Sequence, residues 1–162
     1  MPLTLEGSCR CGAIHFTVES HTPQPYQRCY CSICRKTAGG GGYAINIMGV
    51  AATLRVRGKP AIYRAEICDA EGHCETSSGE RNFCPRCASA LWMADPHWPE
   101  LVHPFASAID TPLPVPESSV HVLLKDKAPW VVPQIGPKDR CFDGYPEESI
   151  EDWHRSRGLW VD

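Results

Sequence analysis

Apolar residues alternate with polar ones along several short stretches of the chain, and a period of two is typical of β-strands. Ile14, Phe16 and Val18 alternate with polar neighbours, so one face of a strand over 14–18 is expected to be buried. The same pattern predicts further strands over 43–47, 54–56 and 120–124. Fifteen prolines and thirteen glycines interrupt the chain, as short strands joined by turns require. The expected fold class is mainly β.

The one helix that the pattern predicts lies near the C-terminus. Pro146 suits a first helical turn, acidic residues follow it, and Gly158 is placed to end the helix. Trp130, Trp153 and Trp160 lie in or near this polar segment. They are expected to be largely buried and to anchor the tail on the β core or on a partner subunit.

The 162 residues are expected to form a single domain, with a core over about 1–127 and a tail and helix over about 128–162. The proline-rich segment 95–117 is expected to be irregular, and its part 111–117 is expected to be a stiff loop between strands rather than a polyproline ligand. A formal charge of −3 with scattered basic residues argues against a nucleic-acid partner. No apolar run approaches the length of a membrane span, and the N-terminal residues lack the pattern of a secretion signal. These features predict a cytoplasmic protein with no membrane partner.

Ten cysteines are the main chemical signal in the sequence. A disulfide framework would spread cysteines along the chain, and a reducing cytosol would not maintain it. Seven of the ten instead fall into three tight clusters: Cys9 and Cys11; Cys29, Cys31 and Cys34; Cys84 and Cys87. The clustering favours metal ligation over disulfides.

Two of these clusters can together hold one ion. If Cys9 and Cys11 lie on a strand, their side chains point to the same face. Cys84-x-x-Cys87 is the usual half of a structural zinc site. Four thiolates would form a closed tetrahedral site that selects zinc or an iron centre and contributes folding energy. The alternative is two unrelated buried cysteine pairs.

The third cluster offers three ligands from one short loop. Three protein ligands and an open fourth position are typical of a catalytic zinc site, so Cys29, Cys31 and Cys34 are the candidate catalytic group. The alternative is a closed site whose fourth ligand is one of the seven histidines or one of the remaining cysteines, Cys68, Cys74 and Cys141. A zinc ion with three thiolates carries a charge of about −1 and suits the binding of a further thiol as its thiolate.

Basic and flexible residues follow this third cluster directly. Arg35 and Lys36 are candidates for binding an anionic thiol co-substrate, or they form an ordinary solvated basic pair. The four glycines over 39–42 either let the backbone approach a peptide-like ligand or form a flexible turn.

The order of these motifs resembles the glutathione-dependent formaldehyde-activating enzyme family, whose domain also occurs in centromere protein V. The similarity rests on Cys9-x-Cys11, Cys29-x-Cys31-x-x-Cys34 and Phe83-Cys84-x-x-Cys87, and extends to the segments 7–12 and 146–154. It implies a β-tent of small antiparallel sheets with two zinc ions. The structural zinc would be held by Cys9, Cys11, Cys84 and Cys87, and the catalytic zinc by Cys29, Cys31 and Cys34.

The resemblance also implies carbon–sulfur lyase chemistry, in which glutathione and formaldehyde combine to S-hydroxymethylglutathione or the adduct is cleaved. Three features depart from the family pattern. Tyr30 stands where a histidine is often found, Ala88 stands where a glycine is usual, and the stretch 65–75 with Cys68 and Cys74 has no clear counterpart.

Two functions are therefore consistent with the sequence. The first is a zinc-dependent lyase whose partners are a small-molecule thiol, glutathione or a similar one, and its aldehyde adduct. The second is a non-enzymatic zinc-binding interaction module, for which chromatin is disfavoured by the negative net charge. The oligomeric state, including a homodimer, is left open.

Overall fold

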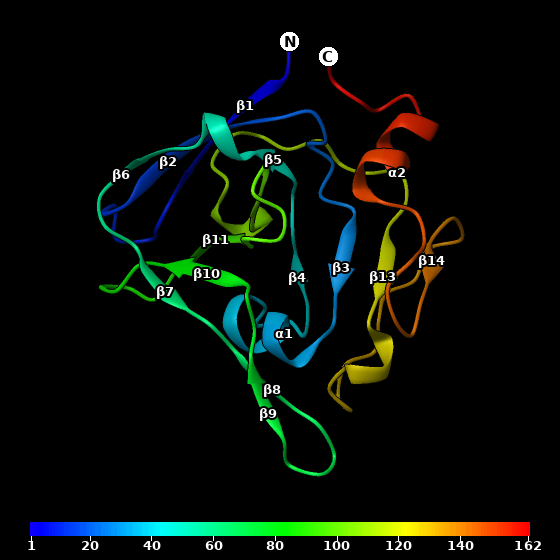
Figure 1. The fold of residues 1–162 in the computed structure, drawn as a ribbon. Helices are drawn as coiled ribbons and strands as arrows, with labels where there is room; N and C mark the ends of the chain where they lie inside the picture. The colour runs from blue at the N-terminus through cyan, green and yellow to red at the C-terminus, as the bar shows by residue number, and fades with distance from the viewer.

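The computed structural model describes all residues 1–162, and it is mainly β, as the sequence predicts. The first sheet is antiparallel in the order β1-β2-β6 and lies on the left of Figure 1. Its strands are β1 (Leu3–Ser8), β2 (His15–Ser20) and β6 (Arg55–Arg57).

The second sheet has five antiparallel strands in the order β5-β12-β11-β10-β7. Its strands are β5 (Gly49–Val50), β7 (Ala61–Tyr63), β10 (Glu80–Phe83), β11 (Ala90–Ala94) and β12 (Leu101–Pro104). A two-stranded hairpin of β8 (Glu66–Cys68) and β9 (Cys74–Thr76) projects from the body of the molecule at the bottom of Figure 1.

The third sheet is mixed, in the order β14-β13-β3-β4, because β13 runs parallel to both β14 and β3. Its strands are β3 (Gln27–Cys29), β4 (Ala44–Ile45), β13 (Val120–Val122) and β14 (Arg140–Cys141). Single 3₁₀ turns are η1 (Ala51–Thr53), η2 (Ala106–Ala108) and η3 (Leu124–Asp126).

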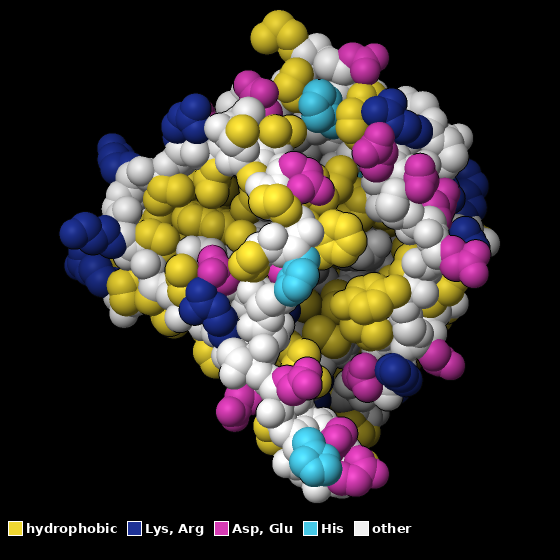
Figure 2. All heavy atoms as spheres, viewed as in Figure 1, with side chains coloured by type: hydrophobic (Ala, Val, Ile, Leu, Met, Phe, Trp, Pro, Cys, Tyr) yellow, Lys and Arg dark blue, Asp and Glu magenta, His cyan; other side chains and the backbone are white.

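Two short α-helices complete the fold. α1 (Ser32–Ala38) follows β3 and lies between the second and third sheets, and α2 (Ile150–Ser156) lies near the two chain ends (Figure 1). Each helix has seven residues, so neither could cross a membrane. Charged side chains of both signs are dispersed over the face of the molecule shown in Figure 2.

The core consists of two main clusters of buried side chains, and each includes cysteines. The first cluster packs between the first and second sheets and includes Cys9 and Cys84. The second lies under the third sheet and includes Cys29 and Cys34. Each candidate metal cluster therefore has two of its cysteines buried in packed apolar surroundings.

The predicted strands are present, with differences at their ends. β2 buries Phe16 and Val18 as the alternation predicts. The strand predicted over 43–47 is shorter, because regular pairing is confined to Ala44–Ile45. Val56 is 41% exposed because β6 is the edge strand of its sheet, so burial there is incomplete.

Three expectations are wrong. The segment 95–117, expected to be irregular, contains β12, whose Val102 and Pro104 are buried, although its part 111–117 has no helix or strand. Trp130 is 67% exposed, because it lies in an irregular segment that no element covers. Helix α1 was not expected, because seven residues are too few to show a helical period.

The predicted C-terminal helix is present, but Pro146 lies outside it, because the first helical turn starts after Ser149. α2 begins after Ser149, whose hydroxyl accepts a hydrogen bond from the backbone N–H of Asp152 at 3.0 Å. Gly158, with φ of 66°, follows its end. Trp153 is 2% exposed and stacks on Tyr26 with ring centroids 3.6 Å apart. Trp160, which is half-buried, stacks on His21 at 4.6 Å, so the tail is held against the β core.

Candidate metal centres

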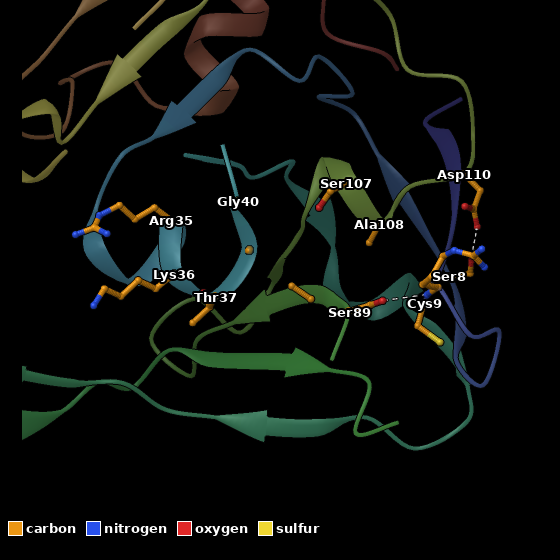
Figure 3. Close-up of a pocket in the computed structure, with 14 residues that line it drawn as sticks. Ser8, Cys9, Arg35, Lys36, Thr37, Gly40, Ser89, Ser107, Ala108 and Asp110 are labelled. Atoms are coloured by element: carbon orange, nitrogen blue, oxygen red, sulfur yellow. Dashed lines mark hydrogen bonds between the residues drawn. The ribbon is translucent and has the colours of Figure 1, made fainter. Parts of the chain in front are cut away.

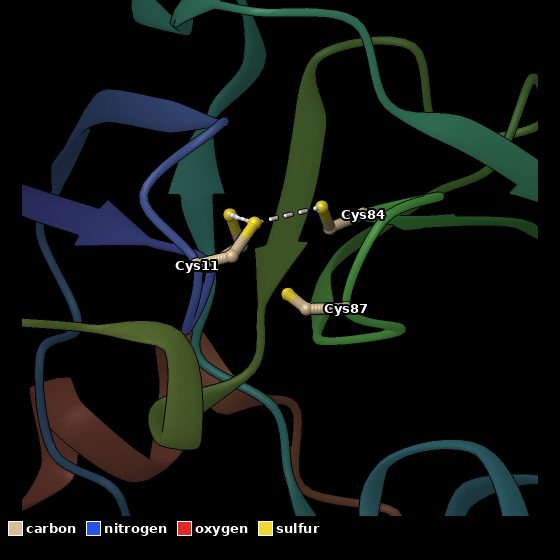
Figure 4. A group of neighbouring side chains, drawn as sticks. Cys11, Cys84 and Cys87 are labelled. Carbon is tan, nitrogen blue, oxygen red and sulfur yellow. Dashed lines mark hydrogen bonds between the residues drawn. The ribbon is translucent and has the colours of Figure 1, made fainter.

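Four cysteines from two distant segments meet between the first and second sheets. Cys9 and Cys11 lie in the turn that joins β1 to β2, and Cys84 and Cys87 lie in the turn that joins β10 to β11. Their four Sγ atoms lie within 4.8 Å of one another. Figure 4 shows Cys11, Cys84 and Cys87 pointing toward one centre, with 3.8 Å between the sulfurs of Cys11 and Cys84.

The sequence pattern predicts that the side chains of Cys9 and Cys11 share one face of a strand, and the structure differs from this expectation. Cys9 and Cys11 converge because the chain turns sharply at Gly12, which has a φ of 77°, and not because both lie on a strand. Their sulfurs are 3.6 Å apart. The chain turns likewise after Cys87, where Ala88 takes a φ of 63° and donates its N–H to the carbonyl of Cys84 at 2.8 Å. Ala88 thus adopts the left-handed conformation for which a glycine would be favoured.

Hydrogen-bond donors beside two of these sulfurs, those of Cys9 and Cys87, favour the thiolate form. The backbone N–H of Ile14 donates to Cys9 Sγ at 3.2 Å, and the Ser89 hydroxyl lies 3.2 Å from Cys87 Sγ. Hydrogen bonds from the side chain and backbone of Ser89 lower the pKa of Cys87 to about 5. Four sulfurs at this spacing, with both Cys9 and Cys84 buried, fit a tetrahedral zinc ion.

The second cluster is built by one turn at the start of α1. Cys29 ends β3, Cys31 is the N-cap of α1, and Cys34 lies within the helix. The N–H of Cys34 donates to Cys31 Sγ at 3.2 Å, which is an N-cap hydrogen bond with sulfur as the acceptor. The three Sγ atoms lie within 4.8 Å of one another. This donor set also fits zinc, with three protein ligands.

No fourth side chain joins this second cluster. Cys68 and Cys74 are joined to each other by a disulfide in the β8–β9 hairpin, so the general preference for metal ligation does not extend to this pair. Cys141 is exposed on β14 and lies outside the cluster. No histidine or carboxylate places a ligand atom among the three sulfurs. The side chains therefore leave one coordination position open.

The three cysteines line a cavity of about 330 Å³. Arg81, on β10, lines it too and donates from Nη2 to Cys34 Sγ at 3.6 Å. Hydrogen bonds from Cys29 and Cys31, together with the Arg81 guanidinium, lower the pKa of Cys34 to about 2 despite burial. Arg81 thus places a positive charge beside a cluster that would be negative when loaded with metal.

Comparison with known proteins is consistent with this arrangement. Residues 4–125 match the family described as "Glutathione-dependent formaldehyde-activating enzyme". The chain belongs to this family. A Halomonas elongata protein named "Putative glutathione-dependent formaldehyde-activating enzyme" is 60% identical over 159 residues, which cover 97% of this chain and 98% of that protein. A crystal structure of a Rhodobacter sphaeroides protein is similar in fold, with a TM-score of 0.51 and 25% identity over 67% of this chain and 91% of that one.

Arg35 and Lys36 lie apart from the cavity of the three cysteines. They line a different cavity of about 630 Å³, whose other walls include Ser8, Ser89 and Asp110. Figure 3 shows both basic side chains extending from α1 away from Ser8 and Asp110. The structure brings Arg81, and neither of these two, to the three thiols; their contact with substrate stays a prediction.

Further polar side chains line the cavity of the three cysteines, among them Tyr145, His103 and the carboxylate of Asp95. Tyr145 is 72% exposed at the rim of the cavity, and partial desolvation of its phenol together with the neighbouring thiols raises its pKa to about 12. Burial lowers the pKa of His103, and its Nδ1 is buried without a hydrogen-bond partner. The cavity therefore offers a protonated phenol and a neutral imidazole.

A buried chain of hydrogen bonds supports the cysteine loop through residues that do not line the cavity. Tyr30, between two of the candidate ligands, donates its hydroxyl to His121 Nδ1 at 2.8 Å. His121 Nε2 in turn donates to Asp139 at 2.9 Å. Burial alone would raise the pKa of Asp139, but hydrogen bonds from His121 and two backbone N–H groups lower it to about 2. Tyrosine at position 30, a departure from the family pattern, is thus part of a satisfied network.

Sequence reasoning did not find Arg81, His103 or Tyr145. Arg81 is 47 residues from Cys34, and no local spacing connects the two. The signal for Arg81 in the sequence is weak: it is a cation two residues before Phe83-Cys84.

Proposed function

We propose that this protein is a zinc-dependent carbon–sulfur lyase that acts on adducts of glutathione, or a similar small thiol, with aldehydes. Formation or cleavage of S-hydroxymethylglutathione is the reaction that family membership suggests. The observation that carries the proposal is the three-cysteine cluster, which faces a cavity and has no fourth side-chain ligand. A purely structural zinc site would be closed by a fourth protein ligand.

Bound by Cys29, Cys31 and Cys34, zinc would hold the sulfur of a substrate thiol in its thiolate form. Arg81 would offset the negative charge that this sulfur adds, because its guanidinium already donates to Cys34. Ile33 and Ile150 supply apolar wall to the cavity and reduce the access of water to the reacting sulfur.

Addition joins the thiolate sulfur to the aldehyde carbon, and the aldehyde oxygen takes up a proton from His103, which would have received it from the substrate thiol. The Tyr145 phenol, which stays protonated, can donate a hydrogen bond to that oxygen from the rim of the cavity. In the cleavage direction the adduct hydroxyl loses its proton while the carbon–sulfur bond breaks. His103, held neutral by burial, can accept that proton. The protein thus supplies orientation and proton transfer for a reaction that thiols already undergo readily.

The structural site has a separate role in this proposal. Zinc bound by Cys9, Cys11, Cys84 and Cys87 would join the β1–β2 turn to the β10–β11 turn, and Arg81 lies on β10. The closed site would therefore help to hold the strand that carries Arg81. A thiol-dependent reaction also suits a reducing compartment, in agreement with the predicted cytoplasmic location.

The test measures both the cleavage of thiol adducts and the ligands of the second metal ion. Zinc-loaded protein would be incubated with a panel of glutathione–aldehyde adducts, and thiol release measured against a metal-free control. X-ray absorption would report three sulfurs and one light atom on the second metal ion without glutathione, and four sulfurs with it. A second site that has four sulfurs without glutathione, together with no turnover of any adduct, would favour the non-enzymatic interaction module instead.

A further inference from the structure

Cys68 and Cys74 form a cysteine pair outside both metal clusters. They lie opposite each other in the β8–β9 hairpin and are joined by a disulfide six residues apart in sequence. Both residues are exposed, as are all their neighbours over 66–76. Exposed disulfides are open to attack by small thiols, whereas buried structural ones are protected.

The cross-link is the main restraint on the hairpin. Each strand has three residues, and none of the six is buried. A two-stranded hairpin without a buried face is marginally stable in water. Apart from strand pairing, Asp69 holds the turn by accepting hydrogen bonds from the N–H groups of Glu71 and His73 at 3.0 and 2.8 Å. Breaking the disulfide would therefore loosen the whole hairpin.

The hairpin borders the cavity of the three metal-ligating cysteines. Ile67, the neighbour of Cys68, lines that cavity, and so do Ser77 and Gly79 just beyond β9. A change in how firmly the hairpin is held would therefore alter one wall of the cavity.

We propose that Cys68 and Cys74 are a redox-active pair that cycles between disulfide and dithiol by exchange with small thiols, and that the reduced form frees the hairpin wall of the cavity. A small thiolate attacks one sulfur of the pair, forms a mixed disulfide and releases the other as a thiolate. A second small thiolate then attacks the sulfur of the bound small thiol. The products are the protein dithiol and the small-molecule disulfide, and two electrons pass from the two small thiols to the protein. The pair would behave in this way whether or not the chain has the lyase activity proposed above.

The charge around the pair determines which thiols react fastest. Carboxylates flank both cysteines, namely those of Glu66, Asp69, Glu71 and Glu75. Figure 2 shows acidic side chains gathered on the projecting hairpin at the bottom of the view. Because like charges repel, an anionic thiol such as glutathione should react more slowly than the cationic thiol cysteamine, and added salt should narrow the difference.

The redox state can be measured directly on the zinc-loaded protein. Tryptic cleavage after Arg64 and Arg81 gives one peptide, 65–81, that contains both cysteines of the pair and no other. The protein would be equilibrated in mixtures ranging from reduced glutathione alone to equal amounts of glutathione and its disulfide. Free thiols would then be alkylated, the protein cleaved with trypsin, and the mass of the peptide measured by mass spectrometry. We expect the peptide to carry two alkylated thiols in reduced glutathione alone and none in the equal mixture, where the disulfide has formed.

Single-cysteine variants test the exchange pathway. In the equal mixture, the remaining thiolate of Cys68→Ser or Cys74→Ser attacks glutathione disulfide, releases one glutathione and keeps the other as a mixed disulfide, because the resolving thiol is missing. Cys141→Ser is the matched control, since Cys141 is exposed and belongs to no pair. A peptide that stays cross-linked in glutathione alone, or that stays a dithiol in the equal mixture, would overturn the redox assignment.

A separate measurement tests whether reduction of the disulfide loosens the hairpin. Amide hydrogen exchange over 66–76 should become at least about tenfold faster on reduction, because the hairpin has no buried face to keep it closed. In the Cys68→Ser variant it should be fast in both redox conditions. Equal exchange in the oxidised and reduced wild-type protein would show that the disulfide does not restrain the cavity wall.

Discussion

At the scale of single residues, Cys31 has two separable roles. Its sulfur belongs to the three-cysteine cluster, and it also accepts the N-cap hydrogen bond of α1. Cys31→Ala should abolish activity and reduce bound zinc from two ions to one, as measured by elemental analysis. Loss of the cap should destabilise the protein by about 1 kcal/mol.

The variant Cys31→Ser separates these roles, because serine is a good N-cap and a poor substitute for a thiolate ligand. It should lose the second metal ion and activity while keeping the stability that the cap provides. Retention of both zinc ions by Cys31→Ala would contradict the assignment of this cysteine as a ligand.

Three cations near the second site are expected to differ in their effect on catalysis. Arg81 contacts Cys34, so Arg81→Ala should lower kcat as well as raise KM for an anionic thiol. Arg35→Ala and Lys36→Ala should raise KM by roughly tenfold or less and leave kcat unchanged, as expected for partly exposed charge contacts. Steady-state kinetics with glutathione and with an uncharged thiol would distinguish the two patterns. Because Arg81 would offset the charge of the bound sulfur itself, Arg81→Ala should lower kcat with both thiols, and an unchanged kcat with both would argue against this role.

Tyr30 is expected to hold the ligand loop in place from outside the cavity. Tyr30→Phe leaves His121 Nδ1 buried without a donor, which should cost about 1–3 kcal/mol of stability. It should also lower the zinc affinity of the second site and change the visible spectrum of cobalt bound there. Tyr26→Phe is the matched control, because Tyr26 is also buried but packs on Trp153. If both variants leave the cobalt spectrum unchanged, Tyr30 is a stabilising residue only.

At the scale of elements, the two ends of the C-terminal region are expected to contribute differently to the free energy of unfolding. Trp153, on α2, is buried against Tyr26, whereas Trp130 is exposed. Trp153→Ala should therefore lower the free energy of unfolding by about 3–5 kcal/mol. Trp130→Ala should change it by less than about 0.5 kcal/mol. Urea denaturation of the two variants measures both values, and equal effects would refute this account of how the tail is anchored.

The elements also show where sequence patterns succeed and where they do not. β2 could be predicted because one face is buried and the other exposed, so alternation is visible over six residues. α2 could be predicted because its caps and charges follow the helix dipole. α1 could not, because seven residues with one buried side chain carry no period. β12 lies in a proline-rich segment, and its pairing with β5 and β11 depends on contacts distant in sequence.

The residues of the candidate sites also differ in whether the sequence could predict them. The two cysteine groups follow from spacing, since C-x-C and C-x-x-C motifs bring sulfurs together by local geometry. Arg81 and His103 reach the cavity only because β10 and β12 lie in one sheet. The pairing of Cys68 with Cys74 depends on the register of a hairpin that shows no alternation to predict it.

At the scale of the whole molecule, the two cysteine clusters restrain different parts of the chain. A metal ion held by the four-cysteine cluster would join turns 73 residues apart, measured between Cys11 and Cys84, beside the first core cluster. The three-cysteine cluster is local to β3 and α1, so it joins no distant segments. Loss of the first metal should therefore weaken the fold, whereas loss of the second should mainly affect activity.

The variant Cys84→Ser tests this division. Cys84 is 0% exposed and is one of four candidate ligands of the closed site, so its replacement should remove the first zinc ion and cost several kcal/mol of stability. Differential scanning calorimetry with elemental analysis would measure both effects, with Cys141→Ser as a control that removes a thiol from neither cluster. Cys31→Ser should show the converse, a nearly unchanged Tm with the second ion lost. If Cys84→Ser keeps two zinc ions and the wild-type Tm, the four-cysteine assignment is wrong, because a closed site coupled to folding cannot lose a ligand without a measurable loss of stability.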